Sequence, residues 1–330
     1  MGVTAAPHTL AGWTPVGVDW ERGRRVIRWC YTDGVEFTDP FFDQTIERCL
    51  QDPFRLLFWR ETEVGSLAEF ASQSPGLEPD GFIFHLSRCG STLLAQMFAG
   101  LSTALVVSEP GPIDAVLRAS SAHPGPGDGE ALDWLRWIVS ALGQRRRDEQ
   151  TRLVIKLDAW AILQLPLIRA AFPDAACVFV YRNPLEVMVS HLGHRGYHMI
   201  PGTLPSAWFG LSARQARAAS AERYFAAVLA RLCQAALDGA RGGHLALVEY
   251  ESLPGAVPET IAPLFGIEVG SPEEAVFAGV AERDAKNPAV AFVADSVEKQ
   301  RRATAAARAA VETWVDPVYE SLDALRQGRP

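Results

Sequence analysis

Residues 82–92, FIFHLSRCGST, place an arginine, a glycine and two hydroxyl side chains within one short turn. An apolar run precedes the turn and the segment LLAQMFAGL follows it, which predicts a buried strand, a tight loop and the start of a helix. Backbone N–H groups at a helix N-terminus favour anions. Gly90 would let the backbone approach a ligand. Ser91 and Thr92 would donate from their hydroxyls, and Arg88 would add a fork of N–H donors. The pattern predicts an anion-binding loop; the alternative is an ordinary strand–helix turn with a capping serine.

The loop differs from the usual nucleotide-binding loop, G-x-x-x-x-G-K-[ST]. No lysine precedes Ser91, and no glycine lies five residues before Gly90. The lysine of that motif contacts the terminal phosphates of ATP. Its absence indicates that this loop holds a different anion.

A second stretch, CVFVYRNPLEVMVSH (177–191), again reads as a strand, a polar turn and a helix. Arg182 leaves the strand end, Pro184 suits the first helical position, and Ser190 lies about two turns further on. Arg182 and Ser190 could both face a second phosphate. The alternative is a salt-bridging arginine and a mid-helix serine. A third stretch, LALVEYESL (245–253), reads as a strand that ends at Tyr250, which could equally be a core tyrosine.

Together the three stretches resemble the sulfotransferases that use 3′-phosphoadenosine 5′-phosphosulfate (PAPS). That family has a loop close to (K/R)SGTT for the 5′-phosphosulfate, R(N/D)P…S for the 3′-phosphate and a YE.L strand end. Here RCGST, RNPLEVMVS and YESL follow in the same order, within roughly residues 82–300. The resemblance implies PAPS as co-substrate, no metal, and nucleotide contacts from Arg88, Cys89, Gly90, Ser91, Thr92, Arg182, Ser190 and Tyr250.

The resemblance also implies catalytic residues. Arg88 would act electrostatically on the leaving phosphate, because an arginine does not give up its proton at neutral pH. Members resembling tyrosylprotein sulfotransferases have a glutamate base about 21 residues beyond the loop cation, and Glu109 stands at that spacing. Lys156 matches a lysine that would stabilise the transferring group. The alternatives are an acid at a helix start for Glu109, a surface lysine for Lys156, and a histidine of the 193–215 segment or its vicinity as the base.

Residues 283–300, RDAKNPAVAFVADSVEKQ, occupy the place of the family's C-terminal loop over the nucleotide. Lys286, Ser296 and Lys299 are candidate phosphate ligands there, although an ordinary loop and helix cap is the alternative. Cys89 lies at a helix N-terminus, where thiol pKa values fall. The family usually has serine at this position, so we expect Cys89 to contribute its backbone N–H and small size rather than act as a nucleophile.

Two other motifs suggest different chemistry. Asp158, at the end of RLVIKLD, could belong to a Walker-B strand, but that would need the missing lysine beside Ser91. His191, His194 and His198 have spacings that could suit zinc, yet no cysteine or acidic ligand is spaced to complete the site. We therefore expect no metal.

The wider pattern predicts an α/β fold: a P-loop-like three-layer sandwich with a central, mostly parallel sheet flanked by helices. The predicted strands are 82–86, 104–107, 152–157, 176–181 and 244–249. The predicted helices are 39–50, 91–101, 111–120, 129–147, 159–171, 184–191, 211–240, 295–313 and 316–326.

We expect residues 1–76 to form an N-terminal segment that caps the acceptor side, and 77–330 to form the sulfotransferase domain. The Gly/Pro-rich stretch near 193–215 would be a lid. Both regions contain aromatic residues that would suit an apolar or aromatic acceptor, or could simply be core: Trp13, Trp20, Phe41, Phe42, Tyr197, Trp208 and Phe209.

The composition narrows the class of protein. The chain has 330 residues, 48% of them hydrophobic, and a net charge of −8. This charge argues against a nucleic-acid partner. There is no run of 18 apolar residues and no basic segment followed by an apolar one at the start, so we expect neither a membrane span nor a signal peptide. Five scattered cysteines without CxxC spacing fit a reducing cytoplasm.

The sequence therefore predicts a cytoplasmic sulfotransferase that moves a sulfuryl group from PAPS to a hydroxyl of a small-molecule or other acceptor. The alternatives are a P-loop kinase or other nucleotide phosphotransferase, which would bind ATP with Mg²⁺, and a non-catalytic nucleotide-binding protein of the same fold. The acceptor and the oligomeric state stay open.

Overall fold

The central sheet contains five strands, all parallel, in the order β5-β6-β4-β7-β8. The structure, a computed structural model, describes residues 10–19, 25–120 and 128–329. The sheet strands are β4 (Pro79–His85), β5 (Ala104–Ser108), β6 (Arg152–Lys156), β7 (Ala176–Tyr181) and β8 (Ala246–Glu249). Their carboxyl ends meet at one edge of the sheet. The five strands predicted from the sequence are all present.

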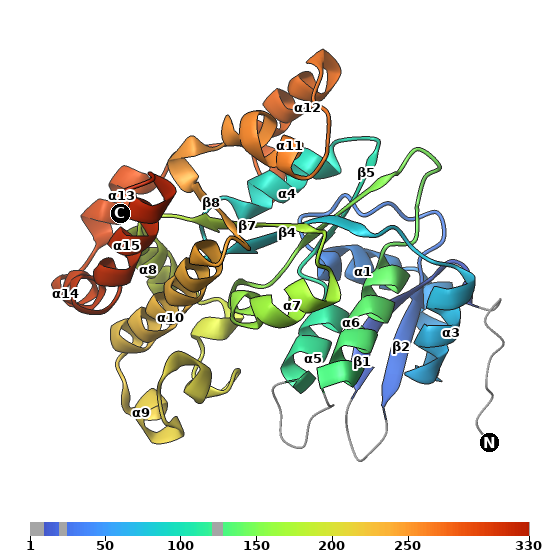
Figure 1. Ribbon diagram of the computed structural model, residues 1–330, viewed down its shortest axis with the longest axis horizontal. Coiled ribbons are helices and arrows are strands. Elements are labelled where there is room, and N and C mark those ends of the chain that lie inside the picture. The colour runs from blue at the N-terminus through green and yellow to red at the C-terminus, as the bar shows by residue number, and fades with distance from the viewer. Residues whose placement is uncertain (1–9, 20–24, 121–127, 330) are drawn as a thin grey trace.

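Helices cover both faces of this sheet, which confirms the predicted three-layer α/β fold. Figure 1 shows α4 (Ser91–Ala99), α11 (Ala262–Leu264) and α12 (Ser271–Ala281) on one side, and α7 (Leu165–Ala171) and α10 (Ala221–Arg241) on the other. The strands are buried almost continuously because side chains on both faces meet helices.

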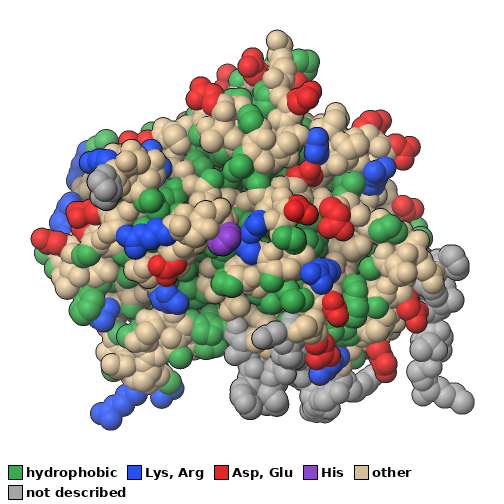
Figure 2. All heavy atoms as spheres, viewed as in Figure 1, with side chains coloured by type: hydrophobic (Ala, Val, Ile, Leu, Met, Phe, Trp, Pro, Cys, Tyr) green, Lys and Arg blue, Asp and Glu red, His purple; other side chains and the backbone are tan. Residues whose placement is uncertain are grey.

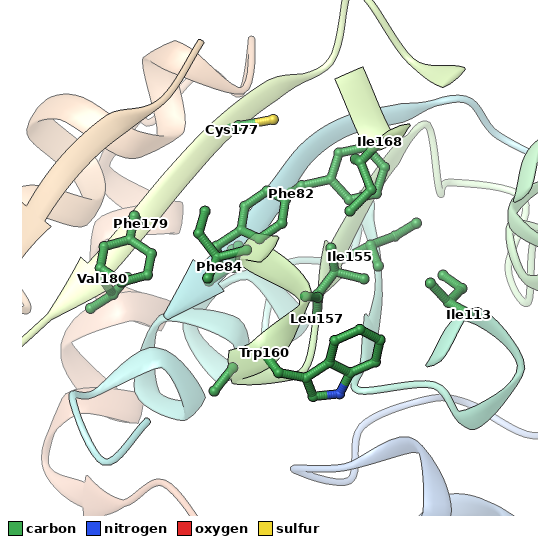
Figure 3. Packing of buried hydrophobic residues seen from close by; sticks show 14 of the residues in the cluster. Phe82, Phe84, Ile113, Ile155, Leu157, Trp160, Ile168, Cys177, Phe179 and Val180 are labelled. Atoms are coloured by element: carbon green, nitrogen blue, oxygen red, sulfur yellow. The ribbon is translucent and has the colours of Figure 1, made fainter. Parts of the chain in front are cut away.

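Aromatic side chains fill the space between the layers. On one face the ring of Phe98 lies 5.5 Å from Phe265 and 6.0 Å from Phe277. On the other face Phe82 of β4 lies 5.4 Å from Phe172 and points toward Ile168 of α7 (Figure 3). These contacts fix the helices to the sheet and so hold the loops at the strand ends.

A second sheet of three antiparallel strands lies beside the first. It consists of β1 (Trp13–Asp19), β2 (Val26–Tyr31) and β3 (Arg60–Glu63). Strand β1 packs on α5 (Gly111–Ser120) and α6 (Asp128–Leu142), and α3 (Gly65–Gln73) also packs on α6. Trp13, Val18, Ile27 and Trp29 of this second sheet belong to the same hydrophobic cluster as the main sheet. The sequence analysis did not predict these strands, and the proposed boundary at residue 76 stays a prediction.

Several predicted helices are divided or begin elsewhere. The predicted helix 39–50 begins later, as α1 (Phe42–Leu50). Asp39 lies before it, and its carboxylate accepts from the Thr45 hydroxyl at 2.7 Å. The predicted helix 211–240 is interrupted before α10, because Ser220 has an extended backbone and caps that helix.

The predicted helix 295–313 is divided where Thr304 caps the second part. The predicted helix 159–171 begins as a 3-10 turn, and the predicted helix 129–147 ends at Leu142. The remaining elements are α2 (Pro53–Leu57), η3 (Ala159–Gln164), α8 (Pro184–Gly193), η4 (Tyr197–Met199), η5 (Ser206–Phe209), α9 (Ala213–Ala218), η6 (Tyr250–Ser252), η7 (Val257–Ile261), β9 (Arg283–Asp284), β10 (Asn287–Ala291), α13 (Ser296–Arg302), α14 (Ala305–Trp314) and α15 (Asp316–Arg326).

Acidic and basic side chains are interspersed over the face shown in Figure 2. Within the ranges that the structure describes, no helix combines the length and the apolar character needed to cross a bilayer.

Candidate functional site

A pocket of about 180 Å³ opens at the carboxyl ends of β4, β5 and β6. Five residues predicted to bind the donor or to act in catalysis line it: Arg88, Ser91, Thr92, Glu109 and Lys286. The other lining residues are Phe41, His85, Ser87, Asp158, Ala159, Gly196, Tyr197 and His198. Segments that are far apart in the chain thus meet at the edge where parallel sheets hold their ligands.

The loop between β4 and α4 has an unusual backbone. Ser87, Arg88 and Gly90 all have positive φ, at 70°, 52° and 83°. The loop is tied to β7, because the Leu86 N–H and the Cys89 thiol both donate to the carbonyl of Val180, at 2.9 and 3.0 Å. The result is a fixed turn that ends at the N-terminus of α4, with Ser91 and Thr92 as its first two residues.

Cys89 is fully buried and does not line the pocket. Burial raises the pKa of its thiol to about 11. This geometry offers the pocket no thiolate nucleophile.

Glu109 follows β5 and forms an ion pair with Lys156, the last residue of β6. The Lys156 side chain is fully buried, so it is not the surface lysine of the alternative interpretation. His85 Nε2 lies 3.3 Å from Glu109 Oε1. Burial on its own would raise the pKa of Glu109, but the charge of Lys156 and the contact with His85 hold this pKa well below its usual range. Glu109 is therefore an ionised, already paired carboxylate.

His198, in the segment predicted as a lid, is 7% exposed and lines the same pocket. Its Nε2 has no hydrogen-bond partner among the described residues. Burial, together with the influence of His85 and Arg88, lowers the pKa of His198 to about 4. At neutral pH this imidazole is uncharged, and its buried Nε2 is left without a partner among the described residues.

Two more groups complete the wall of the pocket. The ring centroid of Phe41 lies 5.1 Å from Lys156 Nζ and 6.0 Å from Lys286 Nζ, so the ring lies near two cations. Burial, with the charge of Glu109, raises the pKa of Asp158 well above its usual range. Arg88 Nη2 donates to the His194 carbonyl at 3.0 Å, which ties the anion loop to the segment after α8.

A second cationic cluster lies at the end of β7. Arg182 is 4% exposed, and its guanidinium donates to Glu186 at 2.6 Å and to Asp295 and Ser296 at 2.8 Å each. Lys299 Nζ lies 2.7 Å from the other oxygen of Asp295. The structure thus brings Arg182, Ser296 and Lys299 together. It also shows that the arginine is already paired with two carboxylates.

Tyr250 lies between the two clusters. Its ring lies over the Arg182 guanidinium, with Cζ 4.1 Å from the ring centroid. A Cβ atom at Gly90 would come within 2.9 Å of the same ring. This close approach and the positive φ explain why glycine is needed there. The ends of β4, β7 and β8 therefore meet at one tyrosine.

The remaining candidates are placed less directly. Ser190 lies one helical turn beyond Glu186 on α8 and shares its face. His191 is buried, and its Nδ1 accepts from the Gly196 N–H at 3.2 Å. Its ring lies 5.4 Å from that of His198. Within the described ranges, no three His, Cys, Asp or Glu side chains are grouped so that they could hold a metal ion.

The aromatic residues proposed for the acceptor pocket separate into two groups. Phe41 and Tyr197 line the pocket. Trp13, Phe42 and Phe209 are buried in the hydrophobic core, which is the alternative that the sequence analysis left open for them. Trp208 stacks on Trp160 with centroids 5.1 Å apart. Trp20 lies outside the described residues.

Sequence reasoning missed His85, Glu186 and Asp295. His85 is the last residue of β4, and nothing in a single sequence distinguishes it from a core residue. Glu186 follows Arg182 by four residues on α8, and this spacing could have predicted the ion pair. Asp295 carries no such signal, because its contact with Arg182 spans 113 residues.

No family model and no curated protein matches the chain. Similar solved structures are sulfotransferases. One from Alicyclobacillus acidocaldarius shares 17% identity over 77% of this chain and 97% of that chain, with a TM-score of 0.45. One from Mycobacterium avium shares 10% over 76% and 81%, with a TM-score of 0.44. The sulfotransferase domain of the Synechococcus PCC 7002 olefin synthase shares 15% over 76% and 95%, with a TM-score of 0.41. These structures carry the name of the family that the motifs resemble, but such low identities and TM-scores do not place the chain in it.

Proposed function

We propose that the protein is a sulfotransferase that moves a sulfuryl group from PAPS to a hydroxyl group of its acceptor. The observation that carries this proposal is the meeting of three motifs, RCGST, RNP and YE, around the ring of Tyr250. A cluster of charged side chains flanks that ring on each side, and a donor with phosphate groups on both the 3′ and the 5′ position of its ribose would use both clusters.

The 5′-phosphosulfate would lie against the turn before α4. Backbone N–H groups of Gly90, Ser91 and Thr92 are at the helix N-terminus there, and Arg88 and Lys286 line the same pocket. Lys156 contacts two lining residues, Glu109 and Phe41, and would add its positive charge from behind them. These cations would stabilise the negative charge that develops on the leaving phosphate.

The 3′-phosphate would lie at the end of β7, one strand from the anion loop, with Arg182, Ser296 and Lys299 as ligands and Ser190 nearby. Its binding requires Asp295 to give up its contact with Arg182, because both anions need the same guanidinium face.

The acceptor oxygen would attack sulfur as the bond from sulfur to the bridging oxygen breaks, and its proton must go to a base. Lys156 holds the pKa of Glu109 well below its usual range, and Oε1 of this carboxylate is already engaged by both Lys156 and His85. His198 is neutral and lines the pocket, and its buried Nε2 has no partner among the described residues. We therefore assign the base to His198, and to Glu109 the task of holding Lys156 and His85 in place.

Titration calorimetry tests the donor. We expect 3′-phosphoadenosine 5′-phosphate to bind, and Arg182→Ala to weaken it about tenfold or more, since one charge-assisted contact is worth about 1.5–3 kcal/mol. Arg241→Ala, an exposed arginine at the end of α10, is the matched control and should bind normally.

Binding of ATP with Mg²⁺ in place of that nucleotide would favour a phosphotransferase. Nucleotide binding without transfer from labelled PAPS to any hydroxyl acceptor would favour a non-catalytic protein.

A further inference from the structure

Two cysteines form a small cluster away from the pocket. Cys30 of β2 and Cys49 of α1 pack with Val35 in a hydrophobic cluster separate from the main core. Both thiols are free and 2% exposed. Two thiols are thus packed in one small cluster between a strand and a helix that contact each other.

Positive charge surrounds one member of this pair. Arg55 Nη1 donates to Cys49 Sγ at 3.6 Å, and Nη2 of the same guanidinium donates to the Asp33 carbonyl at 3.3 Å. Arg48 precedes Cys49 on α1 and adds its charge. The cluster therefore favours a thiolate at Cys49.

Arg146 provides a further cation. Its guanidinium donates to Thr14 and Thr32 at 2.7 and 2.9 Å and lies 4.4 Å from the ring centroid of Phe37. Among the described residues it forms no ion pair with a carboxylate. Burial lowers the pKa of Arg146 to about 10, and the charge of Cys49 opposes this effect. A thiolate at Cys49 would be a counter-ion for this arginine.

The other three cysteines have the opposite environment. Burial raises the pKa of Cys89 and Cys177 to about 11 and that of Cys233 to about 12. The pKa of Cys49 is lowered instead, because the hydrogen bond from Cys30 and the charge of Arg55 outweigh burial. All five cysteines are buried, so thiolate character rather than exposure distinguishes the one that reacts with an oxidant.

We propose that Cys30 and Cys49 are a redox-active pair that a hydroperoxide converts to a disulfide. The Cys49 thiolate attacks one oxygen of hydrogen peroxide, the O–O bond breaks, and hydroxide leaves, which gives Cys49 sulfenic acid. The Cys30 sulfur then attacks the Cys49 sulfur and displaces water after proton transfer. The two thiols lose two electrons, and the peroxide is reduced to two waters.

The bridge would join β2 to α1 across the segment that contains Phe41, whose ring lines the pocket. This inference does not depend on the proposed activity, because the thiol pair lies outside that pocket.

The test uses the native full chain with hydrogen peroxide, followed by acid quenching, alkylation of free thiols after denaturation, and peptide mass mapping. We expect a Cys30–Cys49 linked peptide, lighter than the reduced pair by two hydrogen atoms, that dithiothreitol reverses. Cys89, Cys177 and Cys233 should stay reduced and so be recovered as alkylated thiols. Recovery of Cys30 and Cys49 as alkylated thiols would overturn the proposal. Oxidation of Cys177 at the same rate as the Cys30–Cys49 pair would also overturn it.

Variants separate the two roles. In Cys30→Ser the oxidation should stop at Cys49 sulfenic acid, which dimedone traps. Cys177→Ser should still form the bridge. Arg55→Gln should slow bridge formation roughly threefold or more, because the thiolate loses its nearest cation. Arg25→Gln removes an exposed arginine elsewhere and should leave the rate unchanged. Equal rates in both arginine variants would contradict the assignment of Cys49 as the attacking sulfur, even where a cysteine variant folds poorly.

Discussion

At the scale of single residues, the structure distinguishes two candidates for the catalytic base that the sequence left open. Glu109 is ionised and paired with Lys156, whereas His198 is neutral and faces the pocket. The sequence identified Arg88, Ser91, Thr92 and Glu109 because they follow strand ends with recognisable spacing. It could not rank the two candidate bases, because burial and pairing set a pKa, and these arise only when distant segments meet.

Replacing His198 by Gln should lower kcat by roughly a hundredfold or more, since a positioned base contributes about that factor. On the acid side, kcat/KM reports protonation of the free protein, so kcat/KM should fall with a pKa of about 4. The corresponding fall in kcat should occur at higher pH, because the negative charge of the bound donor beside Arg88 would favour the imidazolium form of His198. Steady-state kinetics with PAPS across acidic pH checks this.

His194→Gln is the matched control, since it keeps the backbone carbonyl that accepts from Arg88. A normal rate in His198→Gln, together with a large loss in Glu109→Gln, would return the role of base to Glu109.

At the scale of elements, the parallel sheet was predictable, since its strands are short apolar runs buried on both faces. Strand β3 was not, because its sequence, RETE, has no apolar residue and its place comes from pairing with β2. Helix α13 was expected near the nucleotide. Its N-cap residue, Asp295, was not expected to contact Arg182, because that contact belongs to the packing of α13 on α8.

Replacing Asp295 by Asn should strengthen binding of 3′-phosphoadenosine 5′-phosphate severalfold. The substitution keeps the shape of the side chain and removes the negative charge that competes for Arg182 and Lys299. Titration calorimetry measures the change. Glu298→Gln, an exposed acid in the first turn of the same helix, controls for general loss of negative charge. Unchanged or weaker binding in Asp295→Asn would mean that the carboxylate does not occupy the phosphate position.

At the scale of the whole molecule, two uncharged histidines are buried side by side between α8, η4 and α10. Burial, together with the neighbouring His198, lowers the pKa of His191 to about 2, and that of His198 is about 4. Both groups would have ordinary values near 6.5 in the unfolded chain. The sequence showed the cluster of histidines but not that they are core.

The free energy of unfolding should therefore fall as the pH drops below about 6.5, since the unfolded state then binds more protons than the folded state. Each histidine should contribute a loss of about 2 kcal/mol by about pH 5. Urea unfolding at neutral and acidic pH measures this loss. His191→Gln should show a shallower decline than wild type, and His244→Gln, which is exposed, should not. Parallel declines in all three proteins would contradict this account.

The contact between Arg182 and Asp295 has a kinetic consequence. The carboxylate belongs to the same chain as the guanidinium, so it competes with a bound phosphate at a fixed effective concentration that dilution does not change. A nucleotide leaving this site would be replaced at once by the protein's own anion rather than by water. The free state would then be a closed and charge-balanced form, and release of the spent nucleotide would be a displacement within the protein.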